Sequence, residues 1–252
     1  MTLFTLATLA EFRAYLSLES GANAPLCHAL RAATAHLEAR TQRRLAPWQG
    51  ERSADLLLHD LRECLLPEDL LELHACEDAF GHPVPLDDLL LLHGSVLHRL
   101  HGRFPYRSTP VGAVRVRGIW GWHPDWAQAW RDTHDLLLSA VDADDAVLPM
   151  VDVDGPDAAL LAPRFSVGQL LRLEAEYCVV LRVDAVANTL HVQRGAHGTT
   201  AAAHPQHTPA ARYLPPPHYV QSCLRYAAFF YRQPLGEAEA LPTDAPPPRL
   251  RS

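Results

Sequence analysis

Two amphipathic stretches, one near each end of the chain, bracket a long middle region that lacks helical periodicity. Near the N-terminus, Thr8 and Glu11 have the spacing of a capping box, which predicts a short helix over about 9–16. A second helix is expected to begin with Asn23 as its cap and to end near Arg43–Arg44. Its apolar residues recur at helical spacing and predict one buried face, made of Leu26, Leu30, Ala33 and Leu37.

The C-terminal stretch "PHYVQSCLRYAAFFYRQP" predicts a closing helix that starts after prolines and ends at Pro234. Its apolar face is made of Val220, Leu224, Ala227 and Tyr231. Since the N-terminal and closing helices each have one apolar face, we expect them to pack together as a small helical bundle.

The middle of the chain consists of short apolar runs separated by Pro, Gly, Asp and Asn, which is typical of strands and turns. A polar stretch, Asp132–Asp145, divides it into two blocks, and "DAVAN" predicts a hairpin turn in the second block. The expected class is therefore α+β, with a long β-rich domain, barrel-like or sandwich-like, inserted between the helices. The predicted divisions are N-terminal helices at 1–46, the β-rich region at 47–214, the closing helix at 215–234 and an extended proline-rich tail at 235–252.

All 22 basic residues are arginines, and the chain contains no lysine, which excludes functions that need a lysine side chain. The chain therefore has neither a Walker-type lysine for nucleotide phosphates nor a Schiff-base lysine. The formal net charge of −7 argues against tight, sequence-independent wrapping of nucleic acid. The five cysteines form no CxxC pair, which favours reduced thiols, and no signal peptide or membrane span is expected.

Histidines are frequent, and two groups suggest a metal site. They are His93, His98 and His101, and His197, His204 and His207. Neither group has a carboxylate at a fixed spacing, so we expect surface and turn histidines, with a histidine-dependent metalloenzyme as an alternative. No nucleophile elbow or other catalytic pattern is present, and we expect neither an enzyme nor a cofactor.

The segment "GIWGWHPDWAQAW" brings together Trp120, Trp122, Trp126 and Trp130. Aromatic platforms of this kind can bind sugars, so a carbohydrate-binding β module is a further alternative. Trp120 and Trp122 share one face of a predicted strand, however, and can equally be buried in a core or at a subunit contact. We expect burial.

The segment Val192–His204, "VQRGAHGTTAAAH", has two glycines that could cradle a phosphate. A phosphate-binding loop opens a helix, but here Pro205 and Pro209 interrupt any helix after the glycines. We therefore expect the end of a strand and an exposed loop. Gly195 and Gly198 would shape the turn, and the side chains available for contacts at its rim would be those of Arg194, His197 and His204.

Several segments, in the order in which they occur, resemble one family, the head–tail connector (adaptor) proteins of long-tailed double-stranded-DNA bacteriophages. The resemblance lies in "LAEFRAYL", "LCHALRAATAHLEARTQRRL", "LLPEDLLELHAC" with "DAFGHPVP", "VRVRGIWGWHPDW", the block that ends in "RGAHGTTAAAH", and "PHYVQSCLRYAAFFYRQ". It spans most of the chain.

The resemblance implies a structural virion protein at the head–tail neck, assembled in the host cytoplasm. Such adaptors form a ring of about twelve copies beneath the portal, extend the DNA channel and receive the stopper or tail protein, through contacts that close by rotation. A net-negative lining would let duplex DNA pass without specific binding. The residues expected at interfaces are Arg194, Gly195, His197, Gly198, Trp120, Trp122, Arg249 and Arg251.

Overall fold

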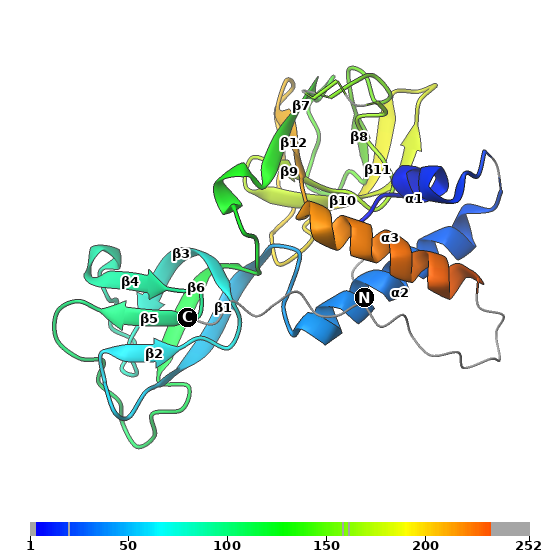
Figure 1. Cartoon of the computed structure of the whole chain (residues 1–252). Helices are drawn as coiled ribbons and strands as arrows, with labels where there is room; N and C mark the ends of the chain where they lie inside the picture. The colour runs from blue at the N-terminus through cyan, green and yellow to red at the C-terminus, as the bar shows by residue number, and fades with distance from the viewer. Residues whose placement is uncertain (1–3, 20, 158, 161, 233–252) are drawn as a thin grey trace.

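The structure is a computed structural model that describes residues 4–19, 21–157, 159–160 and 162–232. These residues form three α-helices and two antiparallel sheets of six strands each, so the mixed α+β class is confirmed. The helices are α1 (Leu9–Leu16), α2 (Asn23–Thr41) and α3 (Pro217–Arg232). The two sheets lie at opposite ends of the molecule, with the helices beside the second sheet (Figure 1).

The helices lie where the sequence pattern predicts them, with three corrections. The helix α2 ends at Thr41 rather than near Arg43–Arg44, Tyr231 on the predicted apolar face of α3 is 42% exposed, and the predicted cap of α2 is wrong. Thr8 and Glu11 form the predicted capping box at the start of α1. The predicted face of α2 is buried as expected. Asn23 does not cap α2, however, because the cap position is Ala22, and the Asn23 Oδ1 atom accepts a hydrogen bond from Arg13 Nη2 at 2.6 Å.

The first sheet, here the N-terminal sheet, has the strand order β3-β6-β1-β2-β5-β4. Its long strand β1 pairs with β6 over Trp48–Ala54 and with β2 only at its end, over Asp55–Leu56. The N-terminal sheet has its own apolar core, which includes Trp120, Leu97 and Val116. Its strands are β1 (Trp48–Leu56), β2 (Glu63–Leu65), β3 (Leu70–Glu77), β4 (Leu89–Leu92), β5 (Val96–Arg99) and β6 (Val114–Trp120).

The second sheet, here the C-terminal sheet, has the order β7-β12-β9-β10-β11-β8. A bridge between Leu137 and Met150 joins the ends of its two outermost strands, so the sheet curls around an apolar interior in a barrel-like form. Its strands are β7 (Trp130–Leu136), β8 (Val147–Pro149), β9 (Leu170–Leu173), β10 (Glu176–Asp184), β11 (Thr189–Gln193) and β12 (Pro209–Tyr213).

The polar stretch 132–145 does not separate two β blocks as predicted, because β7 continues into it. Thr133 and Asp135 are buried there and hydrogen-bonded. The Thr133 hydroxyl donates to Ala210 O at 2.7 Å, and the Asp135 carboxylate accepts from the backbone N–H of Leu136, at 2.8 Å, and of Val151, at 3.1 Å. The predicted hairpin turn between β10 and β11 is confirmed by the pairing of Asp184 with Thr189.

The helices do not have a core of their own. Phe12, Leu30 and Leu224 belong to the same apolar cluster as Tyr177 and Val179 on β10. The other face of β10, with Cys178 and Val180, lines the interior of the C-terminal sheet. The β-rich region thus forms two sheets with separate cores, and the helices pack against β10 of the C-terminal sheet.

Candidate functional site

The segment between β11 and β12 is held by many hydrogen bonds to the rest of the chain. Gly195, His197 and Gly198 have φ angles of 56°, 53° and 83°, in the left-handed region that favours glycine. The loop folds back on β10, where Ala196 N–H donates to Tyr177 O at 2.8 Å. The Thr199 hydroxyl accepts from Tyr177 N–H at 2.9 Å and fixes the same turn from the other side.

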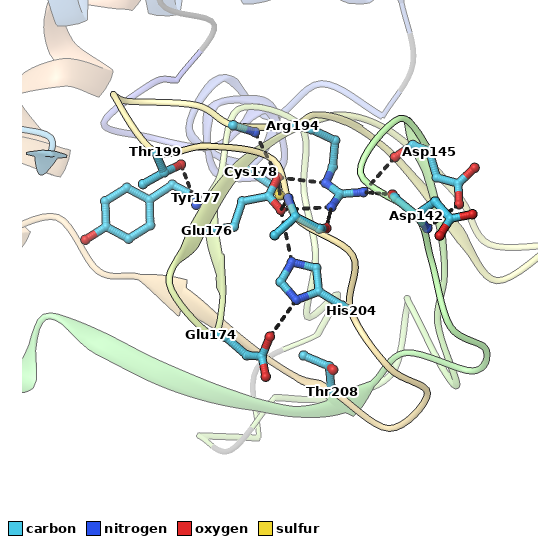
Figure 2. Close-up of polar contacts among 12 residues, drawn as sticks. Asp142, Asp145, Glu174, Glu176, Tyr177, Cys178, Arg194, Thr199, His204 and Thr208 are labelled. Carbon is cyan, nitrogen blue, oxygen red and sulfur yellow. Dashed lines mark hydrogen bonds and ion pairs between the residues drawn. The ribbon is translucent and has the colours of Figure 1, made fainter. Parts of the chain in front are cut away.

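The side chain of Glu176, at the start of β10, lies at the centre of the hydrogen bonds that hold this loop (Figure 2). Its side chain is 1% exposed. The Oε1 atom accepts from Arg194 Nε at 2.7 Å and from Gly195 N–H at 2.8 Å. The Oε2 atom accepts from Arg194 Nη2 at 2.8 Å, from Ala202 N–H at 3.0 Å and from the His204 ring at 3.0 Å. A single carboxylate therefore holds both ends of the loop.

Arg194 and His204 extend this network outward (Figure 2). The Arg194 Nη1 atom donates to the backbone oxygens of Asp142 and Asp145 at 3.0 and 2.9 Å. The His204 Nδ1 atom lies 2.8 Å from Glu174 Oε2, so each ring nitrogen faces a carboxylate. Both contacts are hydrogen bonds only when both nitrogens carry a proton. We call Glu176, Arg194 and His204 the loop clasp.

Glu176 and Arg194 both keep their charges in the folded protein. Burial alone would raise the pKa of Glu176, but the hydrogen bonds from Arg194, Gly195, Ala202 and His204 outweigh it and hold that pKa at about 2. The hydrogen bond to Glu176 raises the pKa of Arg194. Burial raises the pKa of the neighbouring Cys178 thiol, which therefore stays protonated and is a poor nucleophile. These groups are therefore better suited to holding the loop between β11 and β12 in place than to acid–base catalysis.

The tip of the loop joins the two sheets. His197 O accepts from Gln49 N–H on β1 at 2.8 Å, and the His197 Nδ1 atom lies 3.1 Å from Pro47 O. A Cβ atom on Gly198 would lie 1.9 Å from Gln49 O, so only glycine permits this approach. Burial, the main influence, lowers the pKa of His197 to about 4, so the ring is neutral and donates to Pro47 O through Nδ1–H.

The expectation of an exposed loop with Arg194, His197 and His204 at its rim is therefore wrong. The side chains of Arg194 and His204 are 7% and 1% exposed, and their polar atoms are used inside the chain. The physical reason is the buried Glu176, which requires these partners. The exposed residues of this segment are Gln193, Gly198, Thr200, Ala202 and Ala203.

The tryptophans do not form an exposed platform. Trp120 is 0% exposed and donates through Nε1 to Gly50 O at 2.9 Å. Trp122 packs edge-on against Tyr219, with ring centres 5.6 Å apart, and lies under the Arg43 guanidinium. The predicted burial of Trp120 is confirmed. Because Trp120 is 0% exposed in the single chain, its side chain is not accessible for the contact between copies that the resemblance implied. The two other predicted interface residues, Arg249 and Arg251, lie outside the described residues.

The histidine groups are not brought together. His98 lies on β5 and pairs with Glu63 at 3.2 Å, while His101 pairs with Asp88 at 2.8 Å. Within the described ranges, no group of three or more His, Cys, Asp or Glu side chains is arranged to hold a metal ion. No helix in the described part of the chain is long and apolar enough to cross a membrane.

Sequence reasoning did not single out Glu176. One indication was available in the sequence, namely a glutamate at the start of an otherwise apolar strand, "EYCVVL". The loop after the following strand is flanked by Arg194 and His204, which could serve as partners for a buried carboxylate. Comparison with known proteins gave no match to a family model, to a curated protein or to a solved structure.

Proposed function

We propose that this protein is a structural assembly subunit, a head-to-tail adaptor that forms a ring beneath a phage portal. The ring would extend the DNA channel and receive the stopper or tail protein. The sequence resemblance supports this proposal, and its most specific segment is "RGAHGTTAAAH".

The observation that carries the proposal is the role of that segment in the fold. Its Arg194 and His204 hold a buried carboxylate, and its His197 and Gly198 contact the other sheet. The polar residues most suggestive of chemistry thus fix two β-sheets relative to each other. A subunit of a ring under load from packaged DNA needs this kind of rigidity more than it needs reactive groups.

A surface of the N-terminal sheet is suited to contact with a neighbouring copy. The outward face of β2, β5 and β4 carries an apolar strip, which consists of Leu65, Leu90, Leu92 and Val96. Leu65 and Leu90 are 47% and 48% exposed, and β4 is a terminal strand of the sheet. Exposed apolar surface beside a terminal strand is typical of protein–protein contacts. This apolar strip is therefore our candidate for the contact between copies.

The test mixes the purified protein with the portal protein encoded in the same genome and measures the mass of the complexes by mass photometry. Adaptors of this kind can remain monomeric until they meet the portal, so the mass of the protein measured without the portal does not test the proposal. We expect a portal complex with many added copies, which is lost or weakened in Leu90→Asp. The control Leu181→Asp changes a leucine on β10 that is 40% exposed, and it should assemble normally. Absence of any portal complex would overturn the proposal.

A further inference from the structure

A pocket of about 430 Å³ opens where the N-terminal segment, the β7–β12 strand pair and the start of α3 meet. Its apolar lining includes Phe4, Leu214, Pro215 and Val220. Arg131 and Arg212 supply cationic groups to the same pocket. The pocket is separate from the loop clasp, whose residues do not line it.

The two arginines occupy directly opposed positions on neighbouring strands, since Arg212 on β12 pairs in register with Arg131 on β7. Like charges directly opposite each other destabilise a sheet unless an opposite charge lies between them. Here one carboxylate serves both, because Arg212 Nη2 and Arg131 Nη1 both pair with Asp157 Oδ2, the latter at 3.4 Å. Asp157 itself is fully buried behind them, with 0% side-chain exposure.

Arg212 keeps unused hydrogen-bonding capacity. It is 9% exposed, and its Nε atom is buried without a hydrogen-bond partner in the described part of the chain. Burial lowers the pKa of Arg212, Arg131 lowers it further, and Asp157 and Glu11 act in the opposite direction. Glu11 is held at α1, where its Oε2 accepts from Thr8 N–H at 2.7 Å and from the Thr8 hydroxyl at 2.9 Å.

The surrounding backbone also favours a negative charge. The pocket reaches Thr8, the N-cap of α1, and Pro217, the first residue of α3. The N-terminal end of a helix stabilises anions, and the first turn of α3 contains no acidic residue that would do so. The start of α3 therefore adds to the effect of the arginine pair. The start of α1 does not, because the Glu11 carboxylate, which also lines the pocket, already accepts from Thr8 N–H there.

We propose that this pocket binds a small organic anion, whose carboxylate or phosphate is held by Arg131 and Arg212 while its apolar part lies against Phe4, Leu214 and Val220. Guanidinium groups bind both kinds of acid through paired hydrogen bonds of matched geometry. The size of the pocket suits a ligand of one ring or a short chain with its acid group. This proposal does not rest on the assembly role.

The test titrates the full-length protein with benzoate and with phenyl phosphate, and uses neutral benzamide as the control for the apolar part. Binding is followed by NMR line broadening of the ligands and by calorimetry. We expect saturable binding of at least one anion, with a Kd of about 1 mM or lower, and at least about tenfold weaker binding of benzamide. The two anions distinguish a carboxylate site from a phosphate site.

Arg131→Gln is the informative variant, because it leaves the Arg212–Asp157 pair intact. We expect it to weaken anion binding about tenfold, whereas Arg182→Gln, an exposed arginine on β10 outside the pocket, should bind as the unaltered protein does. If Arg131→Gln fails to fold, Val220→Phe, which fills the apolar side, should abolish binding instead. Equal binding of benzamide, no saturable binding of either anion, or binding that is unaffected by the folded pocket variants would overturn the proposal.

Discussion

At the scale of single residues, Glu176 determines the shape of the loop between β11 and β12. The pairs that it forms with Arg194 and His204 are buried, and removing the charge from one member of such a group leaves the others without compensation. Sequence patterns predicted the turn itself, because Gly195 and Gly198 are turn residues. They did not predict the burial of Arg194 and His204, since the partner that requires it lies on a strand 18 residues before Arg194.

Glu176→Gln should therefore destabilise the fold by about 3–5 kcal/mol, because it leaves the Arg194 guanidinium buried without an opposite charge. Chemical denaturation measures the effect. The matched control is Glu174→Gln, which changes the exposed carboxylate on the other side of His204 and should cost less than about 1 kcal/mol. Equal losses in the two variants would contradict the central place of Glu176.

His197 should make the contact between the sheets sensitive to acid. Its ordinary pKa is 6.5 and its folded value is about 4, so between these values the unfolded chain binds more protons than the folded chain. The stability that the neutral ring provides is complete above pH 6.5 and is lost as the pH falls toward 4. Melting temperatures between pH 7 and pH 4 should therefore fall more steeply for the unaltered protein than for His197→Gln. Parallel curves would show that His197 does not contribute.

At the scale of elements, the helices could be predicted and the sheets could be predicted only in part. The helical period and the Thr8–Glu11 capping box are local, so they placed α1, α2 and α3. Alternation and turn residues indicated strands but not their partners. The central strand β1 pairs with β6, far along the chain, and no local pattern specifies such a pairing or the division into two sheets.

The apolar face of α3 is tested by Leu224→Asp. Leu224 is 5% exposed within the cluster shared by the helices and β10, so the new carboxylate would be buried without a partner. We expect a loss of more than about 4 kcal/mol or failure to fold. Gln221→Asp places the same acid on the exposed side of the same helix and should be close to neutral. A near-normal melting temperature for Leu224→Asp would show that this face is not packed as described.

At the scale of the whole molecule, the proposed assembly role assigns the contact with the portal to the tail and the fold to the two sheets and the helices. The proline-rich tail at 235–252 lies outside the described residues, and its sequence has too little apolar content for a core of its own. Its removal should leave the unfolding transition unchanged and weaken association with the portal. A truncated protein that no longer folds would contradict this division of roles.

The most direct test of the assembly role is electron microscopy of the protein mixed with the portal protein from the same genome. We expect class averages with a ring of this protein on the portal axis, which continues the central channel. Bare portals at saturating concentrations of the folded protein would contradict the assembly role.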